Sequence, residues 1–173
     1  MPNEAFPSLD LNVVIGQLAR SAEAIRALAC AIPKVAAQWK PAPDAWSLSE
    51  VLAHLYDEER SDFRQRLQWM LGERNAPPPP REVSGGGALE GFLAEREASI
   101  AWLEALGSPD WDVSVDLTFG QGAEAETLTF RVGDMLVSWV EHDTLHLRQM
   151  VELLHAWYAH VAPPYRTAYA GSW

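Results

Sequence analysis

Two histidines stand four residues apart near the C-terminal end of the chain, in the stretch WVEHDTLHLRQM that spans residues 139–150. On a helix, residues four apart lie on one face, about one turn from each other. His142 and His146 therefore point the same way, at a separation that suits the sharing of one metal ion. Such a pair also arises by chance, so the motif alone is only a hypothesis.

A helical wheel of this segment places His142, His146 and Gln149 together on one flank of the apolar sector. Gln149 is a candidate for binding a substrate, a cofactor or a bound water by a hydrogen bond; an ordinary polar flank is the alternative. Asp143 falls near the middle of the apolar sector, where an unpaired carboxylate would be costly. We therefore expect Asp143 to have a partner, either a histidine ring or an arginine from another helix.

Metal sites that perform chemistry usually take three protein ligands and leave one position open. His160 would lie roughly 27 Å from His142 along one helix, and His155 falls on the opposite flank. The remaining histidine is His54, in the segment WSLSEVLAHLYDEE (46–59), at the edge of a second apolar sector. A lone histidine there is more often a hydrogen-bonded core residue, but three compatible histidines favour one divalent ion. Three histidine ligands suit nickel, zinc and iron alike, so the ligands do not identify the metal.

Two carboxylates lie close to His54 on the same predicted helix. Asp57 and Glu58 are candidates for a catalytic general base, or for accepting a hydrogen bond from a ligand imidazole. The simpler interpretation, which we favour for these two residues, is a solvated helix face.

Hydrophobic periodicity predicts four long helices, over residues 9–38, 47–71, 88–106 and 130–160, the first of which kinks or ends near Pro33. Ser47 and Glu50 form a capping-box pattern at the start of the second helix. Thr129 is the expected N-cap of the fourth. Alternation over 111–119 and again over 126–130 predicts a short two-stranded ribbon before that helix.

The elements together indicate an all-α protein, a four-helix bundle with long crossover connections. The segment APPPPREVSGGG (76–87) predicts a loop, because its prolines lack N–H donors and its glycines add freedom. A length of 173 residues fits one domain, over 1–173. The aromatic segment 163–173 follows the last helix; it either folds back to line a pocket or contributes to a dimer contact.

Composition narrows the class of partner. The net charge of −11 repels phosphate backbones and anionic lipids, so nucleic acid and membranes are poor candidates and a small-molecule substrate is favoured. The N-terminus lacks the basic and apolar regions of a signal peptide, and the single cysteine, Cys30, is compatible with a reducing cytoplasm. Small apolar neighbours of Cys30 favour packing over reactivity.

The segments WSLSEVLAHLYDEE (46–59) and TFRVGDMLVSWVEHDTLHLRQM (129–150) resemble the two signature stretches of DinB-like proteins. The resemblance implies a four-helix bundle of up-down-down-up topology, often assembled as a homodimer. It also implies one divalent metal, commonly nickel, zinc or iron, whose three histidine ligands match His54, His142 and His146. Some relatives are S-transferases or isomerases that use a low-molecular-weight thiol, and others are classed as metal-dependent hydrolases or as stress-response proteins.

Two classes of function follow from these residues. In an enzyme, a three-histidine metal with open positions would bind a thiol as thiolate for S-transfer, or would activate water for hydrolysis. The alternative is a non-catalytic module that binds a metal or a small ligand in a stress response. A fourth protein ligand that closes the coordination shell would favour the second class.

Overall fold

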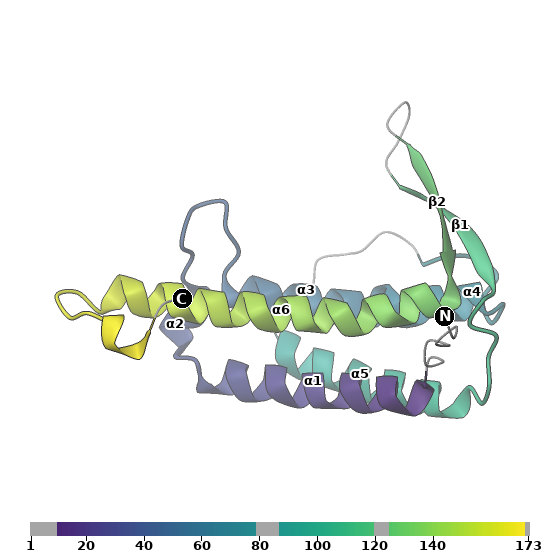
Figure 1. The fold of residues 1–173 in the computed structure, drawn as a ribbon, viewed down its shortest axis with the longest axis horizontal. Helices are drawn as coiled ribbons and strands as arrows, with labels where there is room; N and C mark the ends of the chain where they lie inside the picture. Colours follow the sequence, from purple (N-terminus) through teal and green to yellow (C-terminus); the bar gives the residue numbers. More distant parts are fainter. Residues whose placement is uncertain (1–9, 79–86, 120–124, 172–173) are drawn as a thin grey trace, which may run out of the picture.

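The computed structural model describes residues 10–78, 87–119 and 125–171 of the chain, and its dominant elements are four long helices (Figure 1). The long helices are α1 (Leu11–Ala31), α3 (Leu48–Ser61) continued by α4 (Phe63–Met70), α5 (Ala88–Ala105) and α6 (Val132–Val161). The shorter elements are α2 (Lys34–Gln38), the ribbon β1 (Ser114–Phe119) and β2 (Glu126–Arg131), and a 3₁₀ turn, η2 (Ala168–Ala170). The predicted all-α bundle with a ribbon before its last helix is confirmed.

The helices follow the up-down-down-up order. In Figure 1, α1 and α6 run in one direction along the long axis, whereas α3 and α5 run in the other. Helix α5 packs against α1 and α3, and α6 packs against the same two helices from the other side. Since α3 and α5 are parallel neighbours, the chain has to return along the bundle between Met70 and Ala88.

Local signals set most of the helix ends. Helix α1 ends at Ala31, two residues before Pro33, and the short α2 begins directly after the proline. The capping box is present, because the Glu50 N–H donates to Ser47 Oγ (3.3 Å) and the Ser47 N–H donates to Glu50 Oε2 (2.7 Å). At the end of α5, Gly107 adopts a positive φ of 70°, which favours glycine and ends the helix.

Two predicted boundaries are wrong. The helix expected over 47–71 is interrupted at Asp62, whose φ of −123° and ψ of −84° are not helical. Aspartate favours helix ends over helix interiors, and here the Asp62 carboxylate accepts a hydrogen bond from Arg66 Nε at 2.6 Å. Thr129 does not cap α6: it lies in β2 opposite Asp116 and donates to its carboxylate at 2.7 Å. Arg131 is the N-cap residue instead.

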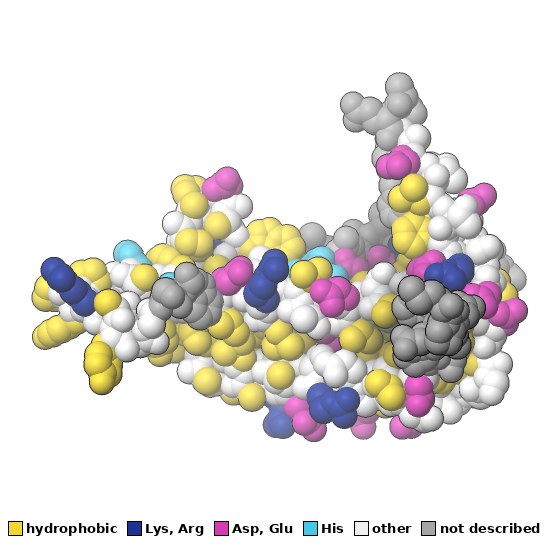
Figure 2. Space-filling view, viewed as in Figure 1, with side chains coloured by type: hydrophobic (Ala, Val, Ile, Leu, Met, Phe, Trp, Pro, Cys, Tyr) yellow, Lys and Arg dark blue, Asp and Glu magenta, His cyan; other side chains and the backbone are white. Residues whose placement is uncertain are grey.

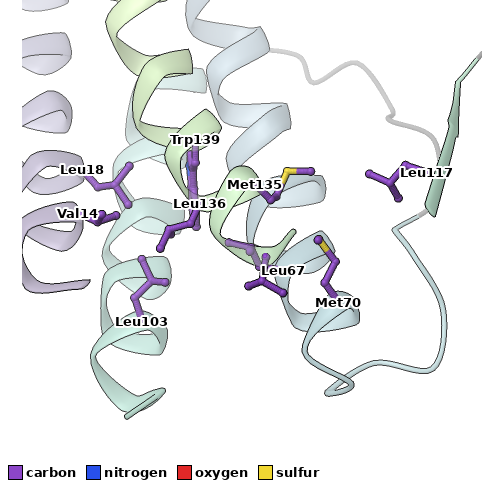
Figure 3. Packing of buried hydrophobic residues seen from close by; sticks show 10 residues of the cluster. Val14, Leu18, Leu67, Met70, Leu103, Leu117, Met135, Leu136 and Trp139 are labelled. Atoms are coloured by element: carbon purple, nitrogen blue, oxygen red, sulfur yellow. The ribbon is translucent and has the colours of Figure 1, made fainter. Parts of the chain in front are cut away.

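Two apolar clusters fill the bundle, one toward each end. The cluster nearer the ribbon is built around the fully buried Trp139, with Leu136 and Leu103 beside it (Figure 3). The other, further from the ribbon, is built around Phe92, near the start of α5, and Met150 of α6. Buried polar side chains occupy the length of the bundle between these clusters. That polar layer is where the candidate site lies.

At the surface, one smaller expectation is wrong, and one of two alternatives for the C-terminal segment is removed. Cys30 is exposed rather than packed. In the segment after α6, Tyr165 and Tyr169 are 82% and 106% exposed, so neither tyrosine lines a pocket; Trp173 lies outside the described residues. None of the helices in the described ranges is long and apolar enough to cross a membrane.

Candidate metal centre

Three histidines from two antiparallel helices meet in the polar layer. His54 comes from the middle of α3, and His142 and His146 come from successive turns of α6. One ligand nitrogen from each ring lies within 4.8 Å of the others. His54 Nε2 is 3.1 Å from His142 Nε2, and His146 Nε2 is 3.2 Å from His142 Nε2. The predicted third histidine is therefore brought together with the predicted pair.

These separations fit one shared ion. Two imidazole nitrogens that bind a metal at the usual distance lie roughly 2.9 to 3.4 Å apart, for coordination angles between a right angle and the tetrahedral value. Both measured Nε2–Nε2 distances, 3.1 and 3.2 Å, fall in that range. The histidine side chains are half-buried, and histidine atoms reach the surface between α3 and α6 (Figure 2). Among the residues that the structure describes, no further His, Cys, Asp or Glu joins this group.

The far side of the His146 ring contacts Gln149. His146 Nδ1 lies 2.8 Å from Gln149 Oε1, and an amide oxygen can only accept, so Nδ1 carries the proton. The lone pair of Nε2 then faces the other two histidines, as metal binding requires. Burial lowers the pKa of His146, which the hydrogen bond to Gln149 opposes. The neutral ring that binds metal is thereby favoured.

Asp57 and Glu58 are buried, so the solvated helix face predicted for them is wrong. Helix α3 packs against both α5 and α6. These two neighbours together cover a wider face of α3 than its apolar stripe alone would predict. Glu58 Oε1 lies 3.8 Å from Nδ1 of His54, on the side of the ring away from the other histidines. Asp57 Oδ1 lies 3.7 Å from Arg60 Nη2, in a different direction along the helix.

Arg96, which the sequence analysis did not single out, is the partner expected for Asp143. Its Nη1 donates to Asp143 Oδ2 at 2.6 Å and its Nη2 donates to Asp143 Oδ1 at 3.0 Å. Nη2 also donates to Glu59 Oε2 at 2.7 Å. Although burial lowers the pKa of Arg96, the two carboxylates raise it above its ordinary value. Phe92, Arg96, Ser99 and Leu103 share one helical face, a pattern that would have marked Arg96 as buried.

Several ionisable side chains are buried around the histidines. Among the described residues they are one guanidinium and four carboxylates: Arg96, Asp57, Glu58, Glu59 and Asp143. Buried charge is costly unless it is paired. Glu59 and Asp143 pair with Arg96. Burial raises the pKa of Asp143, which the hydrogen bond from Arg96 opposes.

A surface pocket of about 360 Å³ adjoins the histidines. It is lined by Asp44, Ala45, Trp46, His146, Gln149 and Leu153. The Trp46 ring is parallel to that of His146, with the ring centres 6.3 Å apart, and meets His54 edge-on at 5.0 Å. The pocket therefore gives a small molecule access to one side of the histidine cluster, over an aromatic wall.

The buried side of the cluster is closed by aromatic packing. The Phe63 ring packs edge-on against His142, with 5.0 Å between the ring centres, and stacks on Trp139 at 5.6 Å. This packing covers one flank of the histidines, and the pocket lies beside His146.

Comparison with known proteins agrees with the fold. Among solved structures, the chain is similar to YfiT from Bacillus subtilis, with 16% identity, a TM-score of 0.64, and coverage of 90% of this chain and 91% of that one. YfiT is described as a probable metal-dependent hydrolase with an unusual four-helix bundle topology. Comparison with curated proteins gave no match. A sequence profile of the DinB superfamily matches residues 17–150, and the chain belongs to that superfamily.

Proposed function

We propose that this protein is a metal-dependent hydrolase that acts on a small molecule, with one divalent ion held by His54, His142 and His146. The observation that carries the proposal is the convergence of three ring nitrogens beside an open pocket. The description of YfiT as a probable metal-dependent hydrolase supports the reaction class. Nickel, zinc and iron all suit three imidazoles, so the proposal does not choose among them.

A divalent ion bound there would supply Lewis acidity, polarising a substrate carbonyl and lowering the pKa of water. The protein's own groups hold and orient the reactants. Gln149 keeps the proton of His146 on Nδ1 and lines the pocket. Trp46 offers an aromatic face to an apolar part of the substrate.

Of the two buried carboxylates, Glu58 is the better candidate for holding a proton near the site. Its carboxylate lies 3.8 Å from His54 Nδ1, whereas that of Asp57 lies beside Arg60. A buried carboxylate with a cation nearby can orient the imidazole and accept a proton during the reaction. We assign Glu58 this role and give Asp57 a structural one.

The alternatives are less well supported. A non-catalytic metal-binding module would favour a closed coordination shell, and no fourth ligand joins the three histidines in the described ranges. S-transfer with an acidic low-molecular-weight thiol would call for a cationic group in the pocket, and its lining residues include no lysine or arginine. Hydrolysis requires neither a closed coordination shell nor a cationic group in the pocket.

Location and assembly form part of the same proposal. We place the protein in the cytoplasm, without nucleic-acid or membrane partners, in keeping with its charge of −11. Exposed apolar side chains gather where α6 extends past the other helices (Figure 2), among them Tyr158 and Val161. They support a homodimer.

The test is hydrolysis of a panel of chromogenic esters, amides and phosphate esters by the protein loaded with nickel, zinc or iron. We expect turnover with at least one metal, and its loss in His142→Ala and Glu58→Gln. His155→Ala is the matched control, because His155 is on the same helix but outside the histidine cluster. Turnover that persists in His142→Ala would contradict the proposal.

A further inference from the structure

Arg96 is the point at which all four long helices meet. From α5 it reaches Asp143 on α6 and Glu59 on α3, and its Nη1 donates to the Leu18 carbonyl of α1 at 3.1 Å. The guanidinium is only 2% exposed, and its two carboxylate partners are 0% and 1% exposed. No other described side chain of α5 contacts the ligand helices through a buried ion pair.

Both carboxylates that Arg96 binds belong to the two helices that carry the proposed metal ligands. Asp143 directly follows His142, and Glu59 is five residues after His54. A planar guanidinium that binds one carboxylate through two nitrogens, and a second carboxylate through one of them, restricts how the two helices can be placed relative to each other. The position of α3 along α6 is thereby tied to the position of α5, which carries no ligand.

The guanidinium is also held on its faces. Its central carbon lies 4.9 Å from the centre of the Phe92 ring and 5.7 Å from that of Trp139. Trp139 Nε1 donates to Glu59 Oε2 at 3.0 Å, so the aromatic group and the carboxylate are linked as well. The fork therefore has little freedom to rotate.

Stability alone does not account for this arrangement. A buried ion cluster is often no more stabilising than apolar side chains of similar volume. This cluster is also incompletely satisfied, since Arg96 Nε and Glu59 Oε1 are buried and have no hydrogen-bond partner in the described part of the chain. The hydrophobic driving force of the apolar clusters on either side is non-directional, whereas the hydrogen bonds of the guanidinium fork have fixed directions.

We propose that Arg96 is a positioning residue that sets the register of α3 against α6, an inference that rests on the proposed metal site. This register makes the nitrogens of His54, His142 and His146 converge. A metal site tolerates displacements of only about 0.5 Å in its ligands. The effect of Arg96 is therefore on metal affinity more than on the stability of the bundle.

The test compares wild type with Arg96→Lys and with the triple variant Glu59→Leu, Arg96→Met, Asp143→Leu. Arg96→Lys keeps the charge but loses the planar fork, so it separates geometry from electrostatic attraction of the ion. Cobalt affinity is measured by titration, and stability by urea unfolding without metal. The matched control is Leu103→Ala, a buried substitution in the other half of α5, which lowers stability without touching the ion cluster.

We expect Arg96→Lys to bind cobalt about 10–100-fold more weakly than wild type, with the triple variant at least as weak and still unfolding cooperatively. Leu103→Ala should keep wild-type affinity. Wild-type affinity in a folded Arg96→Lys variant would overturn the inference, and so would a loss of affinity in Leu103→Ala of the same size. If the triple variant does not fold, Arg96→Lys decides the question.

A second readout does not depend on metal. Correlation spectra of the histidine ring nitrogens in the metal-free proteins report whether the three rings still meet. We expect the pattern of His54, His142 and His146 to change in Arg96→Lys and to persist in Leu103→Ala. Unchanged ring spectra in Arg96→Lys would overturn the inference, whether or not wild type binds cobalt. Absence of cobalt binding in wild type would by itself count only against the proposed function.

Discussion

At the scale of single residues, the hydrogen bond from His146 Nδ1 to Gln149 decides which ring nitrogen faces the site. Partners of this kind typically change metal affinity by about 10–100-fold when they are removed. We predict a loss of that size in Gln149→Leu, measured by metal titration. Gln149→Glu keeps an acceptor at the same position and should retain tight binding. Equal affinity in Gln149→Leu and wild type would exclude this role.

A second prediction concerns Glu50, in the capping box of the helix that carries His54. The pKa of Glu50 is lowered to about 2, first by its hydrogen bond from Lys40 and then by the bonds from Ser47. Because the folded-state pKa lies below the unfolded value, this contribution to stability is present above about pH 4.5 and is lost as the pH falls toward 2. Lys40→Met should raise the pKa of Glu50, as measured by NMR titration of its side-chain carboxyl. An unchanged titration would contradict the assigned cause.

The residue scale also shows what could be predicted from the sequence about the site. The spacing of His142 and His146 and the helix edge occupied by His54 were enough to predict the cluster. Arg96 and Glu59 were missed, because each lies in a run of charged residues that is typical of a solvated helix face. Asp143 was predicted to need a partner, and Arg96 is that partner. The prediction succeeded because the Asp143 carboxylate is fully buried, at 0% exposure.

At the scale of helices and strands, periodicity located every long helix but not every boundary. The break at Asp62 is a local feature, since the carboxylate accepts a hydrogen bond from Arg66, four residues further on. The pairing of Thr129 with Asp116 depends instead on a contact between two strands that a local pattern does not contain. The burial of Asp57 and Glu58 likewise depends on a contact between elements, since it arises from a second neighbouring helix. Local sequence predicts which segments are helical, whereas the packing of neighbouring elements decides which flanks of a helix are covered.

The contact between α3 and α5 gives a prediction at this scale. A Cβ atom at Gly91 would lie 2.7 Å from a carbon of the Tyr56 ring, too close for the ring to remain in place. We expect Gly91→Ala to lower the free energy of unfolding by about 1–3 kcal/mol, despite the higher helix propensity of alanine.

The matched control for that prediction is Gly16→Ala in α1. A Cβ there would meet the mobile end of Arg20 at 3.2 Å, so the substitution should be neutral or slightly stabilising. Urea unfolding of both variants measures the difference. Equal stability of Gly91→Ala and Gly16→Ala would show that α3 and α5 are not in close contact at this point.

At the scale of the whole molecule, two apolar clusters flank a polar layer that contains the histidines and the Arg96 ion cluster. The order of the helices around the bundle was expected from the family resemblance, not from periodicity, since each helix pattern is compatible with several topologies. That residues 1–173 form one domain stays a prediction, as does the dimer.

Metal binding to the folded state alone should stabilise the whole bundle. With free metal at a hundred times its dissociation constant, the expected gain is about 2.7 kcal/mol. We predict a higher midpoint of thermal unfolding with nickel or zinc for wild type, and no change for His54→Ala, because that variant lacks the ligand from α3. A metal-induced shift of equal size in His54→Ala would indicate binding elsewhere.

The most direct measurement of the central claim is the metal content of the purified protein after loading with nickel, zinc and iron and dialysis against a weak chelator. The three-histidine site predicts close to one ion per chain in wild type and in His155→Ala, and almost none in His54→Ala, His142→Ala or His146→Ala. Wild type without metal, or all three single variants with undiminished metal, would contradict it.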